Sequence, residues 1–236
     1  MIKIRTLAIS DIHGCLNQFE ELLKISKYNS NSDQLILLGD YIDRGNKSKA
    51  VLDKVIHLNK EYGVIVLKGN HDQMMIDAFE NDEDGLWLNN GGITTVQSYV
   101  GFDFFNEGFN WDEYLKAKQH IVEFYLDHIK FLKELPLYFE DDKHIFVHAG
   151  INPYYSNWRE QPESEFYWVR EDFYKNATKL SKKVVFGHTP TEYLHGISDI
   201  WFGGDKIGID GACAYGRQLN CLEIKDDGYR QYNIKK

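Results

Sequence analysis

Side chains of the kinds that bind metal ions follow five short apolar runs in this chain of 236 residues. The segments SDIHG (10–14), GDYIDRG (39–45), KGNHD (68–72), HAG (148–150) and GHT (187–189) each begin where such a run ends. Their imidazole, carboxylate and amide groups include no thiolate, which favours Mn, Fe or Zn at a catalytic site over a Cys-type structural zinc site. The six candidate ligands are Asp11, His13, Asp40, Asn70, His148 and His188.

A single catalytic metal ion that keeps open coordination positions needs fewer than six ligands. The number suits two ions that share a bridging carboxylate, and Asp40 is the central candidate for that bridge. Two ions about 3.5–4 Å apart can clamp the attacking and the leaving oxygen of an in-line displacement at phosphorus. We therefore expect two divalent metal ions and attack on a phosphoester by a hydroxide that bridges them.

The apolar runs are expected to be the strands that position these ligands. The runs do not alternate with polar residues, which is typical of strands buried on both faces. Helical spacing over residues 16–28 and 48–61 separates the first three runs, so a β-α-β-α-β unit with parallel strands is predicted. Sites in such sheets form at the carboxyl ends of the strands, where glycine permits sharp turns. The runs are residues 6–9, 35–38, 64–67, 145–147 and 184–186.

The remaining sequence predicts one long helix and a terminal hairpin. Residues 111–132 carry apolar side chains near one helical face, so this helix is expected to pack on the domain or to cover a cleft. Residues 219–224 and 229–234, separated by the turn signal Asp227-Gly228, are predicted to pair as a hairpin. No repeat or linker divides the chain, so a single domain over residues 1–236 is expected. The strand pattern alone leaves open whether the strands form one doubly wound sheet or two packed sheets.

Taken together, the five segments resemble the calcineurin-like metallophosphoesterase superfamily. More narrowly, they are similar to the PPP-type serine/threonine protein phosphatases in their small bacterial and phage lambda phosphatase-like form. Residues 69–78 (GNHDQMMIDA) and 87–92 (WLNNGG) are close to the phage pattern, and the resemblance covers about residues 6–216. It implies an α/β (α+β) fold in which a central β-sandwich is flanked by helices on both sides.

The resemblance also implies how the ligands are shared between the two ions. One pair of residues would hold the first ion, one carboxylate would bridge, and three residues would hold the second ion. The resemblance favours Mn²⁺, with Fe or Zn as alternatives. Asp11 and His13 would hold the first ion, Asp40 would bridge the two, and the second ion would be held by Asn70, His148 and His188.

Further residues gain catalytic and substrate-binding roles from the same resemblance. His71 would be the general acid that protonates the leaving alkoxide. Asp43 would orient His71 and keep it protonated, because a carboxylate partner raises the pKa of an imidazole. Arg44 and Arg170 would bind phosphate oxygens through their planar guanidinium groups. Tyr215, in a loop that borders the site in this family, would face the substrate.

The leading functional hypothesis is hydrolysis of phosphoserine and phosphothreonine in proteins. Asp72 departs from the commonest protein-phosphatase pattern, which has Glu at this position. The Asp form also occurs in symmetrical dinucleoside-tetraphosphate hydrolases of the superfamily, but those usually lack the carboxylate that Asp43 provides here. The alternative is therefore hydrolysis of diadenosine tetraphosphate or of another small phosphoester. A catalytically dead phosphate-recognition module is disfavoured, because all six ligands, His71 and Asp43 are present.

Composition limits the partners that can be expected. The formal net charge is −9 and the pI is about 5.5, so no overall basic field is available to bind a nucleic acid polymer. No apolar run approaches the length of a membrane span, and no membrane partner is expected.

Three cysteines without CxxC spacing fit a reducing cytoplasm. The oligomeric state remains open at this level.

Overall fold

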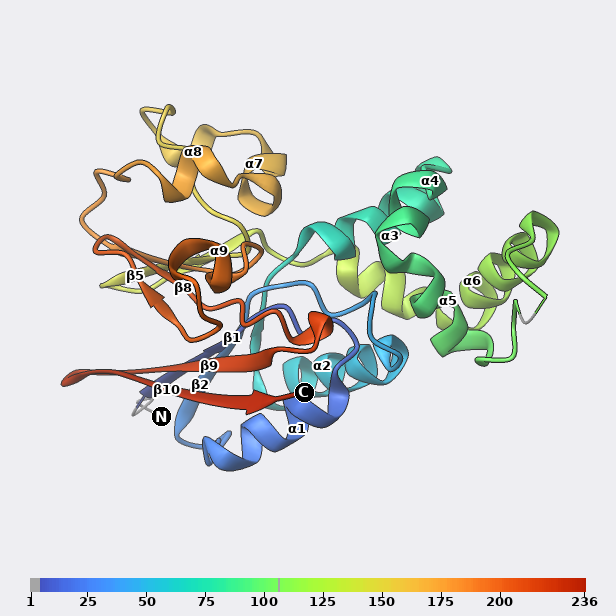
Figure 1. Cartoon of the computed structure of the whole chain (residues 1–236), viewed down its shortest axis with the longest axis horizontal. Coiled ribbons are helices and arrows are strands. Elements are labelled where there is room, and N and C mark those ends of the chain that lie inside the picture. The colour runs from blue at the N-terminus through green and yellow to red at the C-terminus, as the bar shows by residue number, and fades with distance from the viewer. Residues whose placement is uncertain (1–4, 106) are drawn as a thin grey trace.

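The computed structural model describes residues 5–105 and 107–236, and its centre is built from two five-stranded sheets (Figure 1). The first sheet contains β1 (Arg5–Ile9), β2 (Asp33–Leu37), β3 (Ile65–Val66), β9 (Gln218–Lys225) and β10 (Gly228–Lys235). Its strand order is β10-β9-β1-β2-β3. β1, β2 and β3 are parallel, as the β-α-β-α-β pattern predicts, whereas β9 pairs antiparallel with β1 and β10.

The second sheet is also mixed. It contains β4 (Tyr138–Glu140), β5 (His144–Val147), β6 (Lys183–Phe186), β7 (Trp201–Phe202) and β8 (Lys206–Gly208). Its strand order is β4-β5-β6-β8-β7, with β5, β6 and β8 parallel. Each sheet therefore contains three adjacent parallel strands, and the carboxyl ends of β1, β2, β3, β5 and β6 carry the predicted ligands.

An apolar layer between the two sheets makes them a sandwich. Ala8 and Ile36 of the first sheet belong to the same buried cluster as Phe146 and Val185 of the second. Because side chains alternate along a strand, the neighbouring residues of β1 and β2 face the opposite side of the sheet and meet helices there. The expected β-sandwich is thus confirmed, and a single doubly wound sheet is excluded.

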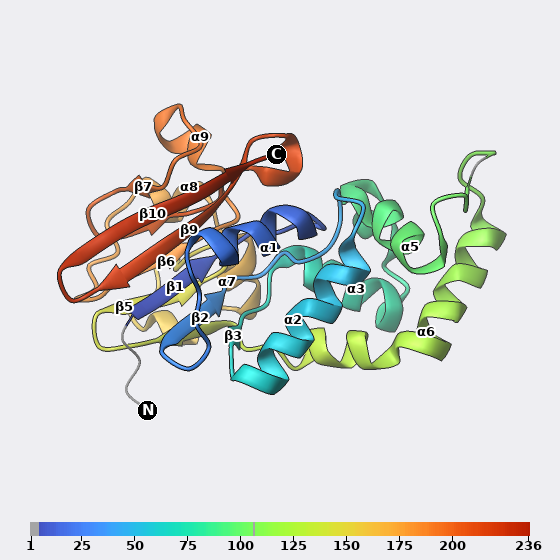
Figure 2. The same ribbon diagram turned by 90° about the horizontal axis from the view of Figure 1, so that it is seen from below.

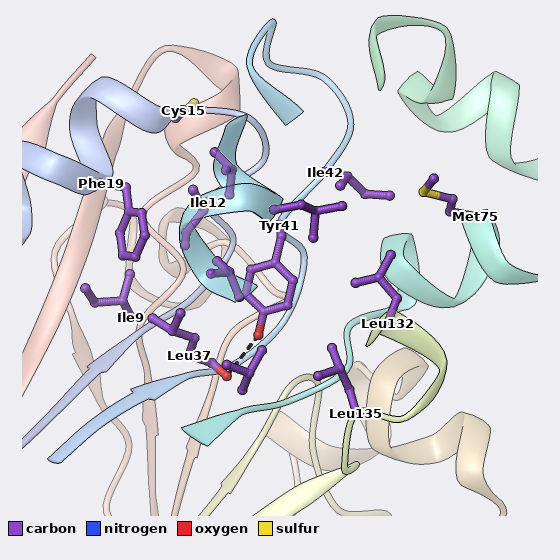
Figure 3. Packing of buried hydrophobic residues seen from close by; sticks show 14 of the residues in the cluster. Ile9, Ile12, Cys15, Phe19, Leu37, Tyr41, Ile42, Met75, Leu132 and Leu135 are labelled. Carbon is purple, nitrogen blue, oxygen red and sulfur yellow. Dashed lines mark hydrogen bonds between the residues drawn. The ribbon is translucent and has the colours of Figure 1, made fainter. Parts of the chain in front are cut away.

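Helices cover the outer face of the first sheet (Figures 1 and 2). Figure 3 shows Phe19 of the first helix beside Ile9 and Leu37, and the hydroxyl of Tyr41 donates to the carbonyl of Leu37 at 3.1 Å. This large core fixes the strand ends from which the site is built. The helices against this face are α1 (Leu16–Ile25) and α2 (Ser48–Tyr62). The other helical elements extend sideways from them, beside the sandwich (Figures 1 and 2): α3 (Asn70–Asn81), α4 (Asp84–Trp87), the π-helical turn Leu88–Gly92, α5 (Ile93–Val100) and α6 (Trp111–Lys133).

Shorter helices cover the outer face of the second sheet. Val147 and Phe186 of that sheet share a buried cluster with Phe166 and Phe173. Both outer faces of the sandwich are therefore helix-covered, as the resemblance implied. The elements on this side are the 3₁₀ turn Trp158–Glu160, α7 (Glu163–Trp168) and α8 (Glu171–Tyr174). The crossover from β6 contains α9 (Thr191–His195), and a 3₁₀ turn (Cys213–Tyr215) precedes β9.

The predicted helices form close to their expected ranges, with one difference in shape. The helix predicted over residues 111–132 is α6, but it is kinked at Tyr125, whose φ of −137° and ψ of 28° are not helical. The Tyr125 ring packs against Tyr99 at 5.0 Å and lies under the Lys49 ammonium at 4.9 Å. Among the described residues, no helix combines the length and the apolarity that crossing a membrane requires.

Candidate active site

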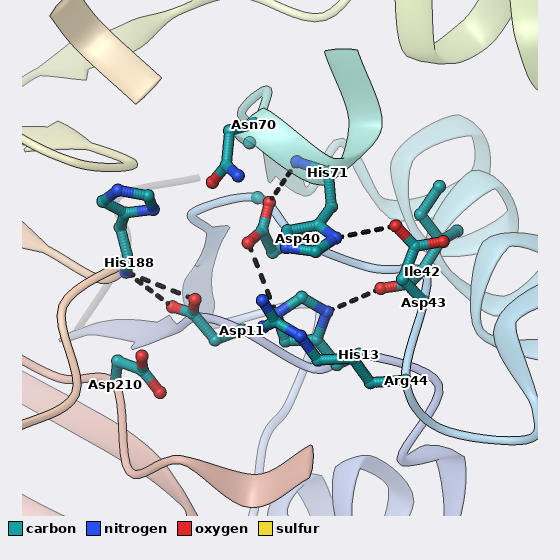
Figure 4. A network of polar contacts seen from close by, with 12 residues as sticks. Asp11, His13, Asp40, Ile42, Asp43, Arg44, Asn70, His71, His188 and Asp210 are labelled. Atoms are coloured by element: carbon teal, nitrogen blue, oxygen red, sulfur yellow. Dashed lines mark hydrogen bonds and ion pairs between the residues drawn. The ribbon is translucent and has the colours of Figure 1, made fainter. Parts of the chain in front are cut away.

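All six predicted ligands follow parallel strands and gather at one end of the sandwich, and Figure 4 labels all of them except His148, which lies beside Asp40 and Asn70. Asp11 and His13 follow β1, Asp40 follows β2, and Asn70 is the first residue of α3 beyond β3. The two remaining ligands come from the second sheet, where His148 follows β5 and His188 follows β6. All six side chains are buried.

The backbone at this end is held in a conformation that most residues avoid. Six of the eleven described non-glycine residues with positive φ are found here. Each such residue costs about 1–3 kcal/mol and persists only where its surroundings over-determine it. The strain concentrates where the chain turns sharply to present a side chain. The six residues are Asp11, His13, Asp40, Asp43, Arg44 and His188.

The carboxylate of Asp40 lies between imidazoles on either side. Its Oδ2 is 3.4 Å from Nε2 of His13, and its Oδ1 is 3.4 Å from Nε2 of His148. Oδ1 also accepts the backbone N–H of His71 at 2.9 Å, which fixes the plane of the carboxylate. One carboxylate that offers a different oxygen to each of two histidines has the arrangement that a bridging ligand needs.

The other ring nitrogen of each of these histidines is held by a backbone carbonyl. Nδ1 of His13 donates to the carbonyl of Ile42 at 2.6 Å, and Nδ1 of His148 donates to that of Leu38 at 2.7 Å. A carbonyl can only accept, so both rings carry their proton on Nδ1 and turn Nε2 toward Asp40. The side-chain oxygen of Asn70 lies 3.0 Å from Nε2 of His148. Outer hydrogen bonds of this kind orient histidine ligands for a metal.

His188 has a ring nitrogen without a hydrogen-bond partner in the same cluster. Its backbone N–H donates to both oxygens of Asp11, at 3.0 and 3.2 Å, while its Nε2 is buried without a hydrogen-bond partner. Burial and the neighbouring charge of His148 hold the pKa of His188 well below its usual value, so the ring is neutral. A neutral imidazole with an unpaired, buried lone pair fits a metal ligand.

The electrostatics of the cluster favour added positive charge. Burial opposes charge on His148, but the adjacent Asp40 carboxylate outweighs it and raises the pKa of His148 to about 9. Burial would raise the pKa of Asp40, yet the surrounding imidazoles, His148 first, hold it well below its ordinary value. The negative potential that attracts a proton to His148 would attract a cation more strongly. The donor set and this potential together fit divalent metal ions.

Two groups of residues have ligand atoms close enough to share an ion, and Asp40 belongs to both. One group is His13, Asp40 and His71, and the other is Asp40, His148 and His188; within each, the ligand atoms lie within 4.8 Å of one another. Asp11 belongs to neither group, because both of its oxygens face the backbone of His188. The structure thus brings the predicted ligands together, with His71 beside His13.

His71 and Asp43 form a buried pair next to the cluster. Nδ1 of His71 lies 2.7 Å from Oδ2 of Asp43, so the ring is held by the carboxylate and its Nε2 is left free. Burial lowers the pKa of His71, and the carboxylates of Asp40 and Asp43 offset this only in part. Asp43 thus raises the pKa of His71, in the expected direction, while burial of the ring lowers it.

Comparison with known proteins identifies the family. The profile described as calcineurin-like phosphoesterase matches residues 4–218. The chain belongs to the calcineurin-like phosphoesterase family. It is 26 % identical over 224 residues to serine/threonine-protein phosphatase 1 of Salmonella typhimurium, covering 92 % of this chain and 90 % of that protein. It is 27 % identical over 242 residues to the asymmetrical bis(5'-nucleosyl)-tetraphosphatase PrpE of Anoxybacillus flavithermus, covering 92 % and 89 %.

Solved structures share the fold of this phosphoesterase. A cold-active protein tyrosine phosphatase superposes with a TM-score of 0.66 at 16 % identity, covering 99 % of this chain and 78 % of the other. The metallophosphoesterase of Sphaerobacter thermophilus gives a TM-score of 0.59 at 16 % identity, covering 98 % and 88 %. Identities this low establish the architecture alone.

Three predicted substrate contacts lie around the phosphoesterase cluster. Arg44 places Nη1 2.6 Å from Nε2 of His13, and its guanidinium lies over the ring of Tyr215 at 5.0 Å. Tyr215 is 62 % exposed and therefore accessible to a substrate. Arg170 is exposed and follows Trp168, whose ring packs edge-on against His188 at 5.9 Å, so Arg170 lies on the His188 side of the cluster.

Two further acids support the phosphoesterase site. The carboxylate of Asp72 accepts the backbone N–H groups of Gly69 and Asp40, both at 2.9 Å, so it closes the start of α3 and anchors the turn that carries Asp40. Asp at the third position of a helix is a capping-box signal, which was available in the sequence. Asp210 lies beside Asp11 (Figure 4), and burial and that neighbour raise the pKa of Asp210 to about 7.

Proposed function

We propose that this phosphoesterase hydrolyses phosphomonoesters of serine and threonine in proteins. The observation that carries the proposal is the buried pair of His71 and Asp43, joined at 2.7 Å beside the metal-type cluster. A serine or threonine alkoxide is a strongly basic leaving group, so a positioned general acid lowers the barrier to its departure. A nucleotide phosphate leaves with far less need of a proton, since the second pKa of a phosphate is about 6.

The roles proposed for the ligands combine the geometry around Asp40 with the family resemblance. Asp40 would bridge two divalent ions, because its two oxygens face different histidines. When bound, the ions would supply the charge that makes water nucleophilic near neutral pH and polarises the phosphoryl oxygens. Asp11 and His13 would hold the first ion, and Asn70, His148 and His188 would hold the second.

The proposed roles of the remaining residues concern the substrate. Arg44 and Arg170 would bind phosphate oxygens with their guanidinium groups. Tyr215 would contact the group next to the phosphate, since its exposed ring supports Arg44. His71 would give its Nε2 proton to the leaving oxygen, and Asp43 would hold the ring in place from Nδ1.

Hydrolysis of dinucleoside polyphosphates is the second candidate. Asp72 favours it, as does similarity to a protein named as a bis(5'-nucleosyl)-tetraphosphatase. In the structure, however, the side chain of Asp72 is occupied with backbone N–H groups of Gly69, Asp40 and Tyr41, so it supports the turn and does not face a substrate. We therefore give more weight to Asp43.

A direct comparison of substrates tests the proposal. The protein loaded with Mn²⁺ would be assayed on phosphoserine, phosphothreonine and phosphotyrosine peptides and on diadenosine tetraphosphate, with kcat/KM as the readout. We expect preference for the phosphoserine and phosphothreonine peptides and loss of turnover without the metal. A strong preference for the dinucleotide would instead establish the second candidate.

The remaining assignments are part of the same proposal. We propose Mn²⁺ as the native ion, with Fe or Zn as alternatives, because the donors are imidazole, carboxylate and amide. We propose that residues 1–236 form one domain, since the last two strands complete the first sheet. The three cysteines are free and buried, which supports a location in the reducing cytoplasm.

A further inference from the structure

The carboxylate that holds His71 is itself held by two side chains from a distant segment. Oδ2 of Asp43 faces His71, whereas its Oδ1 accepts the indole N–H of Trp87 at 3.0 Å and the hydroxyl of Thr95 at 2.6 Å. Asp43, Trp87 and Thr95 are each fully buried. Charge-assisted hydrogen bonds to a buried carboxylate are roughly twice as strong as neutral ones, so Oδ1 has little freedom to move.

Thr95 also fixes the backbone of Asp43. The Asp43 N–H lies 2.8 Å from the Thr95 hydroxyl oxygen and 3.0 Å from that of Ser48. Asp43 has a φ of 71°, a left-handed conformation that costs energy and needs support from its surroundings. The single hydroxyl of Thr95 therefore accepts from the main chain of Asp43 and donates to its side chain.

The segment between Trp87 and Thr95 is shaped for this contact. It contains the two adjacent glycines of WLNNGG, and Gly91 adopts a φ of 107° in the middle of a helical run. A Cβ on Gly92 would lie 2.7 Å from Cδ2 of the Trp87 ring, so only glycine leaves room for the indole. The carbonyl of Gly91 faces the backbone N–H of Arg44 at 3.5 Å. The segment thus wraps around residues 43 and 44.

We propose that Trp87 and Thr95 are positioning residues that aim the general acid through Asp43, an inference that rests on the proposed function. In the reaction, the oxygen of a water molecule forms a bond to phosphorus, and the bond from phosphorus to the serine oxygen breaks. The bonding pair stays on the serine oxygen, which takes the Nε2 proton of His71. The attacking water releases one proton to solvent and His71 takes one back, so the products are the free alcohol and hydrogen phosphate. The indole N–H of Trp87 and the hydroxyl of Thr95 both bond to Asp43, so the two residues would act through that carboxylate.

Variants that lack one hydrogen-bond donor test this role, and the isosteric change Thr95→Val separates it from simple packing. Thr95→Val removes the hydroxyl at nearly constant volume, Thr95→Ser retains it, and Trp87→Phe removes the indole N–H. Turnover of a phosphoserine peptide is compared with that of p-nitrophenyl phosphate, whose leaving group hardly needs a proton. We expect Thr95→Val and Trp87→Phe to lower kcat on the peptide by about 10–100-fold, because small misplacements of a catalytic group cost that much. On p-nitrophenyl phosphate we expect kcat to fall by less than about 3-fold. KM should be unchanged for both substrates. Thr95→Ser, which keeps the hydroxyl, should retain peptide turnover.

A matched control removes the same kind of hydrogen bond elsewhere. The hydroxyl of Thr178 donates to the carboxylate of Asp205 at 2.9 Å, in a loop that contributes no residue to the site. Thr178→Val is therefore expected to leave both activities unchanged. Equal losses on both substrates, or wild-type turnover in Thr95→Val, would overturn the inference while the proposed function stands. A wild-type protein inactive on both phosphoesters would overturn the proposed function and the inference with it.

A spectroscopic readout needs no turnover. The proton between His71 and Asp43 should give a downfield imidazole resonance in the NMR spectrum, assigned by its absence in His71→Asn. We expect this resonance to shift or broaden in Thr95→Val and in Trp87→Phe, and to return to its wild-type position in Thr95→Ser. An unchanged resonance in Thr95→Val would contradict the proposed coupling, because the carboxylate would then be held without the hydroxyl.

Discussion

Nδ1 of His71 lies 2.7 Å from Oδ2 of Asp43, and both side chains are buried beside the cluster around Asp40. This contact commits one ring nitrogen to the carboxylate and leaves the other for proton transfer. In the proposed function the pair would therefore act on the leaving group, whereas the metal ligands would act on the phosphoryl group.

Replacing His71 should lower turnover mainly for substrates with poor leaving groups. We expect His71→Asn to lower kcat on a phosphoserine peptide by roughly 10²–10⁴-fold, the usual contribution of general acid catalysis. On p-nitrophenyl phosphate the loss should be much smaller, and the bound metal measured by elemental analysis should be unchanged. His57→Asn, at an exposed histidine of α2, is the matched control. Wild-type turnover of the peptide in His71→Asn would show that another group donates the proton.

Binding of Mn²⁺ should stabilise the fold. A ligand at about 100 times its Kd adds roughly 2.7 kcal/mol to the free energy of unfolding, which raises Tm by about 5–10 °C in a chain of this size. The cation relieves the negative potential that raises the pKa of His148. Calorimetry with and without Mn²⁺ measures the shift, and a chelator should reverse it. Asp40→Asn removes the bridging charge and should reduce the shift; an equal shift in that variant would place the ions elsewhere.

The gathering of the six candidate ligands was predictable because local sequence places each of them. Each of the six follows a short apolar run, and the parallel strands of one sheet end at the same edge, so strand order alone brings several together. What the sequence could not decide is that His148 and His188 belong to a second sheet. Their runs are separated from the first three by more than 70 positions, and only the packing of Ala8 and Ile36 against Phe146 establishes the sandwich.

The hydrogen bonds that Trp87 and Thr95 donate to Asp43 could not be predicted from sequence patterns either, because the partners are far apart in the chain. Trp87 and Thr95 lie 44 and 52 positions from Asp43, and a Trp or Thr in a helix more often packs than donates to a catalytic carboxylate. The kink of α6 was also missed. Apolar periodicity describes which face is buried but not the contacts of Tyr125 with Tyr99 and Lys49, which come from two other helices.

A methyl group at Gly187 should disrupt the turn that follows β1. A Cβ there would lie 2.0 Å from Oγ of Ser10 and 2.2 Å from Oδ2 of Asp11, so the turn that carries both residues would have to move. We expect Gly187→Ala to cost about 1–3 kcal/mol of unfolding free energy, the usual effect of overpacking, and to weaken Mn²⁺ binding. Urea unfolding and calorimetric titration measure the two effects. Gly85→Ala is the control, because nothing lies within 4 Å of its Cβ position. Equal behaviour of the two variants would refute the steric argument.

Acid stability should depend on an ion-pair cluster far from the site. Arg5 donates to Asp33 at 2.9 Å and pairs with Glu223, joining β1 to β2 and β9. Burial would raise the pKa of both carboxyls, but hydrogen bonds from Arg5 outweigh it and lower both below their ordinary values of 3.8 and 4.5. Groups with lowered folded pKa values stabilise the fold at higher pH. That stability is lost as the pH falls through the folded values.

Arg5→Met tests this directly. Removing Arg5 leaves the buried carboxylate of Asp33 without a cation and Glu223 with only Lys225, at 3.4 Å, so we expect a loss of about 3 kcal/mol at pH 7 in urea unfolding. The difference from wild type should shrink toward pH 3, because the variant's carboxyls become protonated and no longer need a partner. Lys175→Met breaks an exposed pair with Glu171 and should change nothing measurable at either pH. A loss in Arg5→Met that stays constant from pH 7 to pH 3 would mean that the aliphatic stem of Arg5, and not its charge, stabilises the sheet.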